Sequence, residues 1–196
     1  MSEQPTSIVP GAGSGGTVEL ERPRRRPLEW HRGADLGLVL LRFAVGGVFF
    51  GHGMQKVFGL WGGPGIAGFE RTLVAYGYQQ PRTLAWVTGI GELVAGACVV
   101  LGVVTPLAAA GLVALTINTV LLKAGNGFFV AGPAGAGAVE LDVVLGLAAA
   151  AITLIGPGRV ALDDGRPWHR RPASWGTVAL VLGITAGLLV FFLLRA

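Results

Sequence analysis

Five apolar stretches alternate with short polar connections along the chain. They run over residues 36–55, 83–104, 106–123, 139–155 and 175–194. Each approaches the ~20 apolar residues that an α-helix needs to cross a bilayer. Pro106 permits a tight turn between the second and third stretches, and Gly156-Pro157-Gly158 ends the fourth. The pattern predicts an all-α membrane protein with five spans.

Two connections are more than simple linkers. Residues 58–64 are rich in glycine, which predicts turns at the membrane interface. A short amphipathic helix is expected over residues 65–80, along the outer membrane surface, because apolar positions recur there at spacings of three and four. Residues 125–137 are rich in Gly and Ala and predict a re-entrant or capping loop.

Arginines gather on one side of the predicted membrane topology. One cluster precedes the first span and the other lies between the fourth and fifth; their members are Arg24, Arg25, Arg26 and Arg32, and Arg159, Arg166, Arg170 and Arg171. Basic loops stay in the cytoplasm. We therefore expect a disordered, Arg-rich cytoplasmic tail over residues 1–34, a four-helix membrane domain over 35–160, a cytoplasmic loop over 161–174 and a fifth transmembrane helix over 175–196.

Composition supports a membrane protein and narrows the function. Of the 196 residues, 52% are hydrophobic and 13% are charged, whereas soluble domains carry roughly 25% charged residues. The net charge of +4 comes with arginines that flank the spans, so nucleic acid is not an expected partner. Cys98 is the single cysteine, which excludes an intramolecular disulfide and a CxxC redox pair.

Two charged residues interrupt the apolar stretches. Arg42 and Glu92 each lie well inside a predicted span, where a charge costs ~2.5–3.5 kcal/mol on insertion scales and faces a partner. Their depths, counted from the span ends, predict an Arg42–Glu92 ion pair. Either a structural role for this pair or a catalytic or transport role is consistent with the sequence.

Further polar residues are predicted to meet at the outer ends of the spans. We expect one outward-facing pocket formed by His52, Gln55, Lys56, Lys123, Asn126 and Glu140. Simpler explanations stay open: an interfacial histidine, lysines that snorkel to the headgroups, and acids (Glu140, Asp142) that favour a helix N-terminus. No metal site is expected, because the sequence lacks a two-histidine spacing such as HxxxH.

Four motifs together resemble the DoxX family of bacterial membrane proteins. They are Arg42 followed by the run Gly51–Gly59, the segment Gly89-Ile90-Gly91-Glu92-Leu93, the segment Gly125–Phe129 leading to Glu140, and Gly156-Pro157-Gly158-Arg159 followed by Asp163. The likeness covers residues 35–164. It implies a four-helix membrane bundle, with Arg42, His52, Lys56, Glu92 and Glu140 at the family's characteristic polar positions. The Arg-rich tail and the fifth span lie outside that pattern.

The resemblance also implies an association with quinone-linked respiratory complexes. The leading hypothesis is an inner-membrane subunit of a redox or oxidative-stress assembly that holds a quinone, with His52, Gln55, Lys56 and Arg42 as hydrogen-bond donors and Glu92 or Glu140 as a proton relay. A non-enzymatic membrane scaffold and a small-solute or proton-coupled transporter are the alternatives. Membrane lipid and protein partners, or further copies of the chain, are the expected contacts. Whether the chain is itself an enzyme stays open.

Overall fold

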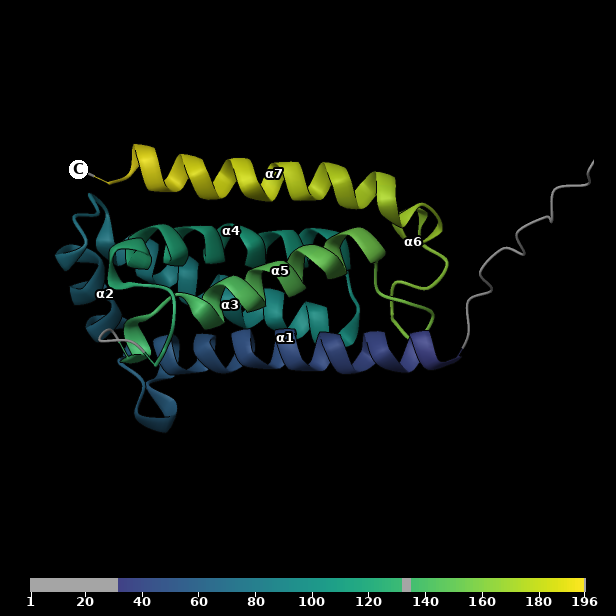
Figure 1. The fold of residues 1–196 in the computed structure, drawn as a ribbon, viewed down its shortest axis with the longest axis horizontal. Helices are drawn as coiled ribbons and strands as arrows, with labels where there is room; N and C mark the ends of the chain where they lie inside the picture. Colours follow the sequence, from purple (N-terminus) through teal and green to yellow (C-terminus); the bar gives the residue numbers. More distant parts are fainter. Residues whose placement is uncertain (1–31, 132–134, 196) are drawn as a thin grey trace, which may run out of the picture. The chain divides into compact units, whose positions relative to one another are not determined.

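The computed structural model describes residues 32–131 and 135–195, and this part of the chain is helical without a β-strand. The long helices lie side by side, with the short α2 and α6 at opposite ends of the bundle (Figure 1). The elements are α1 (Arg32–Phe58), η1 (Leu60–Gly62), α2 (Gly65–Ala75), α3 (Pro81–Leu101), α4 (Thr105–Lys123), η2 (Ala124–Asn126), η3 (Gly135–Gly137), α5 (Glu140–Ile155), α6 (Pro167–Arg170) and α7 (Pro172–Leu193). Apart from residues 32–34, which begin α1, the expected tail lies outside the described residues.

Within the described residues, four helices are long and apolar enough to cross a membrane. They are α1, α3, α4 extended to Asn126, and α7. The fourth expected span, 139–155, forms α5, but its 16 residues reach only about 24 Å at 1.5 Å per residue. The hydrocarbon core is ~30 Å thick. The chain is therefore an all-α membrane protein, as expected, in which α5 packs beside α4 and α7 without reaching the length of a full span.

Glycines bring α1 and α3 into close contact. A Cβ added at Gly53 would lie 2.6 Å from the backbone nitrogen of Leu93, and one at Gly46 would lie 2.6 Å from the carbonyl oxygen of Gly96. Small residues allow such approach between membrane helices. These contacts set the antiparallel register of the pair, with Gly53 level with Leu93.

The predicted fifth helix, α7, packs on α4 through a stripe of small residues. A Cβ on Gly187 would lie 2.8 Å from the Ala114 carbonyl oxygen, and one on Gly183 would collide with the Ala110 carbonyl. The opposite face of α7 exposes large apolar side chains such as Val181, Leu182 and Leu189, which suits contact with lipid. A buried core containing Val45, Phe49, Val99, Leu112 and Ile152 joins α1, α3, α4 and α5.

The connection between α5 and α7 is tied to the end of the bundle where α1 begins. Asp163 accepts hydrogen bonds from the backbone N–H of Val104 and of Thr105, both at 2.8 Å, and from the Thr105 hydroxyl at 2.9 Å. These bonds satisfy N–H groups that the start of α4 leaves without partners. Val104 has a φ of 46°, a conformation that is unusual for a β-branched residue.

Candidate functional site

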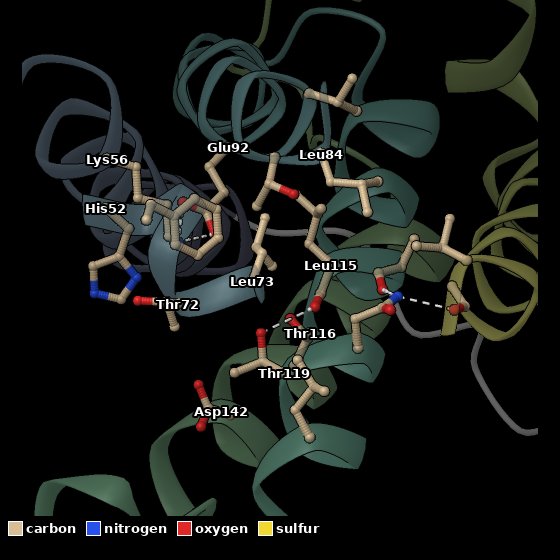
Figure 2. Close-up of a pocket in the computed structure, with 18 of the residues that line it drawn as sticks. His52, Lys56, Thr72, Leu73, Leu84, Glu92, Leu115, Thr116, Thr119 and Asp142 are labelled. Carbon is tan, nitrogen blue, oxygen red and sulfur yellow. Dashed lines mark hydrogen bonds and ion pairs between the residues drawn. The ribbon is translucent and has the colours of Figure 1, made fainter. Parts of the chain in front are cut away.

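A cavity of about 430 Å³ opens at the end of the bundle where α1 ends and α3 begins. We call it the end cavity. Side chains from α1, α2, α3, α4, α5 and α7 line it, and Figure 2 shows ten of them labelled. Its volume lies within the range of pockets that hold small molecules, about 300–1,000 Å³.

One wall of the end cavity carries a buried ion pair. Lys56 Nζ lies 2.5 Å from Glu92 Oε1 and 2.5 Å from Oε2. The side chains are 20% and 6% exposed, respectively. The ammonium also lies 5.1 Å from the centre of the Phe69 ring on α2, within the range of a cation–π contact. Lys56 occupies the last turn of α1, where a cation suits the helix dipole.

A second ion pair lies on the side of the cavity formed by α4 and α5. Lys123 Nζ donates to Asp142 Oδ2 at 2.8 Å. His52 also lines the cavity, and the charges of Lys56, Asp142 and Lys123 all act on its imidazole. Two cations, two carboxylates and one histidine therefore share a single concave site. His52, Lys56, Glu92 and Asp142 are labelled in Figure 2.

The rest of the lining is mainly apolar. Leu73, Leu84, Leu115, Leu122 and Val190 contribute to it. The hydroxyls of two lining threonines already donate to their own helix, Thr116 to Leu112 O at 2.8 Å and Thr119 to Leu115 O at 3.2 Å. The cavity wall thus combines two ion pairs, carried by four helices, with apolar side chains that suit a hydrocarbon surface.

A hydrogen-bonded chain joins three elements around the cavity. The Tyr78 hydroxyl donates to Asn118 Oδ1 at 3.1 Å, and Asn118 Nδ2 donates to Gly187 O on α7 at 2.9 Å. The backbone N–H of Gln79 donates to Leu194 O at 3.0 Å. Burial raises the pKa of Tyr78 above its ordinary value, although the positive charge of Arg195 opposes the shift. The α2–α3 connection is therefore fastened to α4 and to the end of α7.

The expected Arg42–Glu92 ion pair is wrong. Arg42 is 3% exposed, and its guanidinium donates to Pro157 O at 2.7 Å and to Val160 O at 2.8 Å, at the far end of the bundle from the cavity. The register of α1 against α3 explains the error. Gly53 is level with Leu93, and Arg42 lies eleven residues further along α1, or about 16 Å. Arg42 therefore cannot be a donor in the end cavity.

The other predicted site residues divide into two groups. The structure brings His52, Gln55, Lys56, Glu92 and Lys123 together around the end cavity. Asn126 and Glu140 do not line it and instead hold the loop before α5, where Asn126 Nδ2 donates to Gly137 O at 3.2 Å and Glu140 Oε2 accepts from Val130 N–H at 3.0 Å.

Sequence reasoning missed three residues of the site. Asp142 was interpreted only as a helix N-terminal acid, and Tyr78 and Asn118 were not identified. A signal for Asp142 was available: residues two apart on a helix point about 200° apart, so Glu140 and Asp142 cannot both face the bundle. Within the described residues, no three His, Cys, Asp or Glu side chains gather as a metal site.

The family model DoxX matches residues 37–125. The comparison with curated proteins and the comparison with solved structures gave no match. The matched segment contains His52, Lys56, Glu92 and Lys123, whereas Asp142 and the wall contributed by α7 lie beyond it. The described residues contain four helices long and apolar enough to cross a membrane, and residues 37–125 match the DoxX family model. Together these findings make the chain a multi-pass membrane protein.

Proposed function

We propose that this chain is a membrane subunit of a quinone-linked redox or oxidative-stress assembly, and that the end cavity holds the quinone headgroup. We place it in the bacterial inner membrane with the N-terminus in the cytoplasm, because the arginines of residues 159–171 form a basic connection at the end where α1 begins. The observation that supports the proposal is the mixed lining of the end cavity, in which hydrogen-bond donors and two ion pairs occur among apolar side chains.

The chemistry of a quinone matches this mixed lining. Its two carbonyl oxygens accept hydrogen bonds, and its ring and tail are apolar. His52, Gln55, Lys56 and Lys123 supply donors beside the wall formed by residues such as Leu115 and Leu122. Glu92 and Asp142, each hydrogen-bonded to one of these lysines, are carboxylates through which protons can reach a ligand. Electrons would come from a redox cofactor on a partner subunit.

Quinone binding to the purified chain tests the proposal. The full chain in lipid nanodiscs would be titrated with decylubiquinone and with menadione, and binding would be measured by calorimetry. We expect His52→Ala to weaken binding at least several-fold, because one donor is lost. His169→Ala, at the opposite end of the bundle, is the matched control and is expected to bind as the unmodified chain does.

The outcomes separate the candidate functions. Unchanged binding after His52→Ala and after Gln55→Leu would rule out the end cavity as the quinone site. If neither quinone binds while redox subunits still copurify with the chain, a scaffold role replaces the quinone-binding role. Solute uptake by proteoliposomes that depends on Glu92 would instead favour a transporter.

A further inference from the structure

Four arginines form an exposed surface at the end of the bundle opposite the end cavity. We call Arg159, Arg166, Arg170 and Arg171 the arginine surface; all four are exposed. They lie in and around α6, on the connection between α5 and α7 (Figure 1). Within the part of the chain that the structure describes, no hydrogen bond or ion pair occupies their guanidinium groups.

The acidic residues of the same connection do not neutralise this surface. Asp163 is 3% exposed, and both of its oxygens accept hydrogen bonds from residues 104 and 105. Asp164 pairs with His169, with 3.2 Å between Oδ1 and Nδ1. Four arginines against one exposed carboxylate therefore leave this connection with a net positive charge.

The backbone that carries the arginine surface is held in place from inside the bundle. Arg42 binds the carbonyl oxygens of Pro157 and Val160, Asp163 binds the start of α4, and the N–H of Arg159 donates to Asp35 Oδ1 at 3.0 Å. Three separate anchors thus fix the connection on which the arginines stand. Such preorganisation lowers the cost of ordering a binding surface.

Exposed apolar side chains lie among the arginines. Val160 is 59% exposed and Leu162 is 67% exposed. A nucleic acid would leave these side chains in water, whereas a membrane accepts them into its acyl region beside the headgroups. This end also contains the ends of α3 and α5 and the starts of α1, α4 and α7, so the arginines lie where the apolar helices stop. Headgroup phosphates occupy that level, and a guanidinium binds phosphate with two parallel hydrogen bonds.

We propose that the arginine surface is a binding site for anionic phospholipid headgroups. It recognises the phosphate through the guanidinium groups, and Val160 and Leu162 insert beside the acyl chains. This site is independent of any ligand in the end cavity. Its occupation by anionic lipid would hold this end of the bundle at the surface of an anionic leaflet.

Native mass spectrometry of the full chain in detergent tests this directly. The protein would be titrated with palmitoyl-oleoyl phosphatidylglycerol and, separately, with the matching phosphatidylcholine. We expect tighter binding of phosphatidylglycerol, falling about five-fold for each arginine replaced by glutamine, since each basic residue near an anionic surface contributes about that factor. The preference for phosphatidylglycerol over phosphatidylcholine should decrease as the salt concentration rises, because salt screens the charges.

A matched pair of double variants locates the effect. Arg170→Gln with Arg171→Gln removes two charges from the arginine surface. Arg71→Gln with Arg82→Gln removes two exposed arginines from the cavity end. We expect the first pair to lose phosphatidylglycerol selectivity and the second to keep it. Equal losses from both pairs would overturn the proposal.

Two further arms keep the result decisive. Replacing all four arginines by lysine retains the charge but removes the two parallel N–H donors of each guanidinium, so the selectivity for phosphatidylglycerol should fall only in part. A folded lysine variant without any selectivity would overturn the contribution of about five-fold per charge on which the proposal rests. Inorganic phosphate should displace phosphatidylglycerol no better than chloride at equal ionic strength. Stronger displacement by phosphate would identify a free-anion site and overturn the lipid assignment.

Discussion

Lys56 on α1 and Glu92 on α3, 36 residues apart in sequence, meet in the end cavity with Nζ 2.5 Å from each carboxylate oxygen. Within the described residues, Lys56 is the side chain that hydrogen-bonds the Glu92 carboxylate. Removing one partner of a buried pair leaves an uncompensated charge, which is more costly than removing both.

We therefore predict that Lys56→Met and Glu92→Leu each lower the free energy of unfolding by about 3–5 kcal/mol. The double variant should lose much less unfolding free energy than the two single variants lose together. Reversible unfolding in mixed micelles measures the free energies for a double-mutant cycle. Losses that add without a coupling energy would contradict the pairing.

Arg42 supports a different prediction, because it bridges two carbonyl oxygens at the opposite end of the bundle. Lysine carries the same charge but lacks the planar fork that reaches both acceptors. Arg42→Lys should cost roughly 2 kcal/mol or more. Along the bundle axis, Arg42 on α1 and Glu92 on α3 lie about 16 Å apart. The losses of unfolding free energy caused by Arg42→Leu and by Glu92→Leu should therefore add to within about 0.5 kcal/mol. A coupling energy between the two substitutions well above about 0.5 kcal/mol, measured in the same unfolding assay, would support an Arg42–Glu92 ion pair after all.

The packing of α7 on α4 is tested by two glycines. A methyl group at Gly183 would meet the Ala110 carbonyl, whereas one at Gly111 on α4 meets nothing within 4 Å. Gly183→Ala should therefore destabilise the protein by about 1–3 kcal/mol. Gly111→Ala should be neutral or stabilising, because alanine favours a helix. Thermal unfolding followed by circular dichroism checks the pair, and similar shifts for both variants would show that the contact with α4 is not the cause.

Tyr78 should make the stability of the cavity end depend on pH in the alkaline range. Burial raises the pKa of its hydroxyl in the folded state, so the stabilisation is complete below the unfolded value of about 10 and is lost as pH rises through the folded pKa. The chain has two tyrosines, and a Tyr76→Phe variant leaves Tyr78 as the only chromophore for a phenolate absorbance titration. In that background Arg195→Gln should move the Tyr78 pKa still higher, because the charge of Arg195 opposes the shift. A lower Tyr78 pKa in the Arg195→Gln variant would contradict the placement of Arg195 beside the Tyr78 hydroxyl.

The pattern of apolar residues was sufficient to predict the long helices, although not the four-residue α6 within the expected loop 161–174. Long apolar runs form helices in a membrane because each backbone group must find its partner within the segment, and that requirement is local. Pro106 and Gly156 mark helix boundaries in the sequence, and α4 and α5 begin and end within one or two residues of the expected positions. A charged residue such as Glu92 within an apolar run also signals a buried polar contact without knowledge of the fold.

The partners of the charged residues were decided by tertiary structure. Depth counted from helix ends suggested that Arg42 would reach Glu92, but the contacts of Gly46 and Gly53 with α3 set a register that places Lys56 there instead. Likewise, only the rotation of α5 determines that Asp142 enters the cavity while Glu140 holds the neighbouring loop. The sequence thus determined which segments are helices and which residues need a partner. The axial register and rotation of packed helices, which depend on contacts between distant segments, decided which partner each one has.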